Sequence, residues 1–92
     1  MNNPLAQLGQ LKKMRDEAMK LKKELEAEQV TVEKNGVEIL ISGDQHIKEL
    51  KTNGRSDNDI KDAVNEAIKK SQEVGARKFS QMSGGIQGLL GR

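Results

Sequence analysis

The sequence predicts an α+β fold in the order α-β-β-β-α, with a small antiparallel sheet between two long helices. Apolar residues recur at steps of three and four near both ends, whereas they alternate with polar residues in the middle. A helix over residues 5–27 would be roughly 35 Å long, and strands of about 6 residues reach only roughly 20 Å. We therefore expect the helices to extend beyond the sheet, where a second copy of the chain, a nucleic acid or both would cover them.

The first helix is predicted from Pro4 and from a narrow apolar seam. Proline suits the first turn of a helix, because its missing N–H has no helical partner at that position. The seam has the 3-4-3-4 spacing of a heptad, which is typical of a helix packed against another helix or a strip of sheet. Its members are Leu11, Met14, Ala18, Leu21 and Leu25.

Three strands are predicted next, the first two as a hairpin. Apolar and polar side chains alternate over residues 30–33, and after Asn35-Gly36 the residues Val37, Ile39 and Ile41 alternate with Glu38, Leu40 and Ser42. Both turn residues tolerate the positive φ of a type I′ turn, so this pair is a strong hairpin signal. A third strand is expected over His46 to Lys51, and the spacing of its apolar residues indicates a bulge or an exposed edge.

The second helix is predicted to begin after Ser56, a favourable N-cap, with Asp57 and Asp59 complementing the helix dipole. Residues 83–92 are rich in glycine and are expected to form a flexible tail. The side chains expected to form the buried face of the helix are Ile60, Val64, Ala67, Ile68, Ser71, Val74 and Phe79.

Composition indicates one small domain over residues 1–92. Only 34% of the residues are hydrophobic, Phe79 is the sole aromatic residue, and there is no cysteine for a disulfide. Small domains without disulfides often gain stability by forming oligomers. We therefore expect a homodimer.

Several classes of protein are disfavoured by the sequence. The N-terminus lacks the pattern of a signal peptide, and no apolar run approaches the length of a membrane span, so we expect a cytoplasmic protein without membrane contact. His46 is the only histidine, and a lone histidine beside a turn is usually a surface or packing residue. We expect no enzyme activity, no cofactor, no metal site and no small-molecule substrate.

Basic residues cluster on both predicted helices, although the net charge is only +2. One interpretation is a solvated flank with i,i+4 ion pairs, such as Asp16 with Lys20 or Glu66 with Lys70. The other is a stripe that contacts phosphates, which requires only Lys and Arg near the nucleic-acid backbone. The basic residues are Lys12, Lys13, Arg15, Lys20, Lys22 and Lys23 on the first helix, and Lys69, Lys70, Arg77 and Lys78 on the second.

Three segments together resemble the YbaB/EbfC family of nucleoid-associated proteins. Residues 10–25 are similar to the family's opening helix, which is rich in Met and Lys. Residues 37–50 resemble its alternating strand, glycine and following strand, and residues 78–88 resemble its closing Lys-x-x-x-x-Ser-x-Gly-Met-Gln pattern. The likeness covers nearly the whole chain.

The resemblance implies a bacterial, nucleoid-associated homodimer in which the two chains share a sheet region and the helices project like tweezers. It also implies binding of double-stranded DNA with low sequence specificity, to organise the nucleoid or modulate expression. The ten basic residues named above are then the expected DNA contacts. The alternative is a protein-interaction module that binds a protein partner through its helices and its C-terminal tail.

Overall fold

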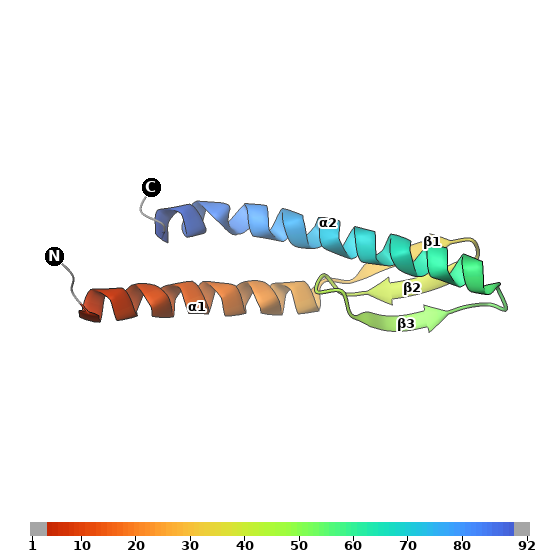
Figure 1. The fold of residues 1–92 in the computed structure, drawn as a ribbon, viewed down its shortest axis with the longest axis horizontal. Helices are drawn as coiled ribbons and strands as arrows, with labels where there is room; N and C mark the ends of the chain where they lie inside the picture. The colour runs from red at the N-terminus through yellow and green to blue at the C-terminus, as the bar shows by residue number, and fades with distance from the viewer. Residues whose placement is uncertain (1–3, 90–92) are drawn as a thin grey trace.

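The computed structural model describes residues 4–89, with side chains placed for residues 7–81, and confirms the predicted α-β-β-β-α order. The molecule is elongated, with extents of 64 × 20 × 17 Å. The two helices run side by side beyond one end of the sheet (Figure 1). The elements are α1 (Pro4–Ala27), β1 (Val30–Lys34), β2 (Val37–Ile41), β3 (Ile47–Lys51) and α2 (Asp57–Leu89).

The sheet is antiparallel and has the strand order β1-β2-β3. Asn35 and Gly36 form the predicted hairpin turn, with φ angles of 56° and 80°. The expected irregularity at the third strand is also present, because the β2–β3 register shifts between Leu40 and Ile41. β3 is therefore a bulged edge strand, and all five of its residues are exposed.

The hydrophobic core lies between α2 and one face of the sheet. Alternate residues of β2, namely Val37, Ile39 and Ile41, point into this core and are fully or almost fully buried. They meet Ala63 and Ala67 of α2, whose small side chains let the helix approach the strands closely. Among the described residues, α2 packs over β1 and β2 but not over β3. One strip of this sheet face is consequently left without a helix above it.

The start of α2 is as predicted. The N–H of Asp59 donates to Ser56 Oγ at 3.1 Å, and the N–H of Ile60 donates to the Ser56 carbonyl at 3.0 Å. The first bond satisfies a donor that has no partner within the helix, and the second is the first hydrogen bond of the helix itself.

The later part of α2 differs from the sequence prediction in two respects. Phe79 was expected to be buried, but its side chain is 51% exposed because α2 has passed the end of the sheet at that point. The helix also continues to Leu89, through most of the segment expected to form a glycine-rich tail. Extending a helix adds one hydrogen bond per residue without repeating the cost of nucleation. Residues 90–92 lie outside the described part of the chain.

The apolar seam of α1 is only partly covered. Leu21 and Leu25 are half-buried, whereas Leu11 is 62% exposed. The N-terminal half of the seam is therefore not covered within one chain. The reason is that this half of α1 extends away from the sheet and the core, as the helix lengths predicted.

Candidate nucleic-acid interface

A closely packed junction at the end of α1 holds this helix beside α2. The N–H of Gly43 donates to the Leu25 carbonyl at 2.9 Å, and Ser71 Oγ donates to the Ser42 carbonyl at 2.7 Å. A Cβ atom at position 43 would lie 3.0 Å from the Leu25 carbonyl oxygen, so glycine permits the close approach. The loop after β2 thus joins the end of α1 to the middle of α2 and sets where α1 leaves the sheet.

Charge is separated along the molecule. We define the helical arm as residues 7–27 of α1 and 69–81 of α2, which lie side by side beyond the sheet (Figure 1). The arm carries ten basic and five acidic side chains, whereas residues 28–68, the sheet body, carry five basic and nine acidic ones. The small net charge of +2 therefore conceals a basic arm and an acidic body.

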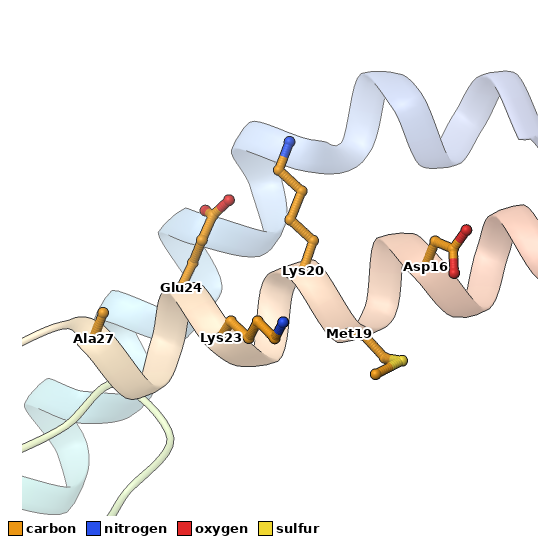
Figure 2. A pocket seen from close by; sticks show the side chains of 6 residues that line it. All are labelled: Asp16, Met19, Lys20, Lys23, Glu24 and Ala27. Carbon is orange, nitrogen blue, oxygen red and sulfur yellow. The ribbon is translucent and has the colours of Figure 1, made fainter.

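All six basic side chains of α1 are exposed. At 3.6 residues per turn, four of them fall within about a third of the helix circumference. Met19 lies on the same side of α1 by this spacing, and it points away from the side on which α2 is drawn (Figure 2). We call this side the outer face of α1, and its basic residues are Lys12, Arg15, Lys22 and Lys23.

The other two basic residues of α1, Lys13 and Lys20, lie on the flank of the helix rather than on its outer face. Figure 2 shows Lys20 and Glu24 extending toward the side of α1 on which α2 is drawn, whereas Met19 points the opposite way. The basic residues of α1 therefore form two groups that differ in direction, a distinction that the sequence prediction did not make.

Two hollows lie on α1. One is lined by Asp16, Met19, Lys20, Lys23, Glu24 and Ala27 and is the subject of Figure 2. The other is lined by Leu8, Leu11, Lys12, Arg15, Asp16 and Met19. Exposed apolar side chains thus lie between basic ones on this helix. Such a surface suits a ligand with an anionic backbone and apolar parts between its charges.

The four basic residues of α2 differ in their surroundings. Lys69 and Arg77 are exposed, and neither takes part in an ion pair among the residues that the structure describes. Lys70 lies 4.0 Å from Glu66 and 3.9 Å from Glu73, which is the loose i,i+4 and i,i+3 arrangement of a solvated helix. Lys78 instead forms a close ion pair, with its Nζ atom 3.0 Å from a carboxylate oxygen of Glu28. Glu28 was not singled out from the sequence.

His46 takes part in a local polar cluster. Its Nδ1 atom lies 3.0 Å from the Asp44 carboxylate, which also accepts a hydrogen bond from Ser42 Oγ. That hydrogen bond is the largest cause of the lowered pKa of Asp44, and the interaction with His46 adds to it. The carboxylate lies between the other two side chains, so the histidine is not arranged to activate the serine hydroxyl. The cluster closes the loop between β2 and β3.

In the described part of the chain, no group of three or more His, Cys, Asp or Glu side chains could hold a metal ion. Within residues 4–89, neither helix combines the length and apolar character needed to cross a membrane.

Comparison with known proteins adds a family assignment to this geometry. A search of curated proteins finds no matching sequence. The model of the YbaB/EbfC DNA-binding family matches residues 1–86, which is nearly the whole chain. This chain, with its basic helical arm and its small antiparallel sheet, therefore belongs to the YbaB/EbfC DNA-binding family.

Proposed function

We propose that this protein binds double-stranded DNA with low sequence specificity through the outer face of α1, as a homodimer in the bacterial nucleoid. Its role would be to organise the nucleoid or to modulate gene expression. The observation that carries the proposal is the charge separation, because ten of the sixteen basic residues lie on the arm. The family match supports DNA as the ligand.

The dimensions of the outer face suit a duplex. Lys12 and Lys23 are eleven residues apart, which corresponds to roughly 17 Å along a helix. Double-stranded DNA presents one phosphate charge per roughly 1.7 Å of its axis, so many phosphates lie within that span. Contacts between phosphates and Lys or Arg give affinity and fix orientation without reading sequence. Low specificity follows from a surface that contacts the backbone.

The homodimer is proposed from the uncovered strip of sheet. Ile47 and Leu50 of β3 are 43% and 46% exposed, beside the strands that α2 covers. β3 is also an edge strand, with backbone groups available for pairing. A second copy packed against β3 would bury these side chains and present two arms. Sedimentation equilibrium should give twice the mass of the 10.2 kDa chain, and Leu50→Glu should shift the protein toward the monomer.

The DNA-binding test compares two charge-matched double variants of α1. Each neutralised phosphate contributes roughly −0.9 to the slope of log affinity against log salt concentration. One contact therefore adds about eightfold to the affinity at 0.1 M salt relative to 1 M salt. Lys12→Gln with Arg15→Gln should therefore weaken binding about 60-fold for each arm that contacts DNA. The control, Lys13→Gln with Lys20→Gln, removes the same charge from the flank and should cost less than about fivefold. Equal losses in the two variants would refute the assignment to the outer face.

A second candidate function is a protein-interaction module. It is favoured by the exposed apolar side chains Leu8, Leu11 and Phe79 on the arm. Such a module would bind its partner with little dependence on salt, and the two double variants would both retain binding. Absence of DNA binding at 50 mM salt would favour this function over the first.

A further inference from the structure

In the described part of the chain, one ion pair joins α2 to the residue that directly follows α1. Lys78 of α2 and Glu28, the residue after the end of α1, are 3.0 Å apart, and their side chains are 28% and 35% exposed. The other ion pairs of the described residues lie within α2 or within the loop that contains Asp44. The Lys78–Glu28 pair is therefore placed to influence how α1 and α2 lie relative to one another.

The pair lies at the junction where the arm leaves the sheet body. The N–H of Glu28 donates to the Leu25 carbonyl, which also accepts the N–H of Gly43. Lys78 is about one turn along α2 from Gly75, the glycine nearest to Gly43 and Leu25. The ion pair and the backbone contacts thus lie in the same small region.

A small rotation at this junction would move the tip of α1 appreciably. Leu8 lies seventeen residues before Leu25, which is roughly 26 Å along the helix. A rotation of about 10° at the junction would move that end by about 4.5 Å, more than the rise of 3.4 Å between successive phosphates of one DNA strand. The direction of α1 therefore decides which of its basic side chains reach phosphates together.

We propose that Glu28 and Lys78 are positioning residues, which hold α1 in the direction required for DNA binding. In this role Lys78 acts through Glu28 and not as a phosphate contact. The inference rests on the proposed DNA-binding function, but its structural part concerns the protein without DNA.

The first test asks whether Glu28→Gln raises or lowers the affinity of the protein for DNA. Removing an acidic charge from a protein that binds an anionic ligand should raise its affinity if charge alone matters. Loss of a positioning pair should instead lower the affinity, by up to about fivefold, because fewer molecules hold α1 in the binding direction. Glu26→Gln is the matched control, since Glu26 is exposed and forms no ion pair with another of the described residues. It should raise affinity slightly.

The second test measures the distance between the arm and the sheet body in the absence of DNA. The chain has no cysteine, so spin labels can be placed on Gln7→Cys and Asp62→Cys, and labelled protein diluted with unlabelled protein. We expect Glu28→Gln and Lys78→Gln to broaden the distance distribution and Glu26→Gln to leave it unchanged. The exchanged pair, Glu28→Lys with Lys78→Glu, should restore the narrow distribution.

Two results would overturn the inference. One is an unchanged distance distribution in folded Glu28→Gln protein, with folding confirmed by a cooperative thermal transition. The other is a rise in DNA affinity of Glu28→Gln equal to that of Glu26→Gln. If the unaltered protein does not bind DNA at all, the proposed function fails, whereas the distance measurement still decides whether the pair holds the arm.

Discussion

Substituting Gly43 by alanine tests the junction that holds the arm. A Cβ atom at this position would lie 3.0 Å from the Leu25 carbonyl oxygen and 3.3 Å from both Glu28 Cβ and Leu25 Cδ2. The first neighbour is backbone, which cannot move aside without shifting the end of α1. Relief of the clash therefore requires the junction to open and the Gly43–Leu25 hydrogen bond to lengthen.

The cost can be estimated from measured effects of overpacking. Forcing an extra carbon into a well-packed site typically costs about 1–3 kcal/mol. In a domain of this size, each kcal/mol shifts the midpoint of thermal unfolding by about 4–8 °C. We expect Gly43→Ala to unfold at least about 4 °C below the unaltered protein, measured by circular dichroism at equal protein concentration.

Gly75→Ala is the matched control on the other side of the junction. Its Cβ would lie 3.5 Å from the Gly43 carbonyl oxygen and 3.9 Å from Leu25 Cδ2, which are ordinary contact distances. Replacing glycine by alanine inside a helix stabilises it by about 0.5–1 kcal/mol. Gly75→Ala should therefore unfold at a higher temperature. A Gly43→Ala midpoint equal to or above that of the unaltered protein would refute the packing derived for the junction.

Three further predictions concern the sheet body. Ile39→Ala, in the centre of the core, should lower the free energy of unfolding by about 2–5 kcal/mol in urea titration; a loss below 1 kcal/mol would contradict its burial. Ser56→Ala removes the cap of α2 and should cost about 1 kcal/mol, with Ser56→Asp as a control that restores it. The pKa of Asp44 is lowered from its ordinary value of 3.8, so its contribution to stability is present above that pH and is lost as the pH falls. Asp44→Asn should therefore flatten the acid side of the stability profile, and an unchanged profile would argue against this assignment.

The elements of the fold were predictable because each has a strong local signal. The Asn35-Gly36 turn, the cap at Ser56 and the alternation along β2 act over a few residues, and the structure confirms all three. What α2 buries depends instead on where the sheet ends. Phe79 has the spacing of a buried residue, but no strand lies beneath it, and sequence periodicity carries no information on that point.

The candidate site was predictable in composition but not in arrangement. The sequence identifies the basic residues and shows that they lie on helices. It does not show that Lys78 pairs with Glu28, because the two residues are fifty positions apart. Gly43 appears in the sequence only as a residue that ends a strand, and its close contact with Leu25 emerges from the tertiary packing. The separation of charge between arm and body likewise depends on knowing where the sheet ends.

The most direct test of the central claim is the affinity of the unaltered protein for a mixed-sequence DNA duplex across a salt series from 50 to 200 mM. Four phosphate contacts on one outer face predict a slope of roughly −3.6 in a plot of log affinity against log salt, and two such faces predict roughly −7. The affinity should accordingly fall by at least about a hundredfold over this range. An affinity that does not change with salt, or no binding at 50 mM, would contradict the claim that the basic arm binds DNA through its phosphates.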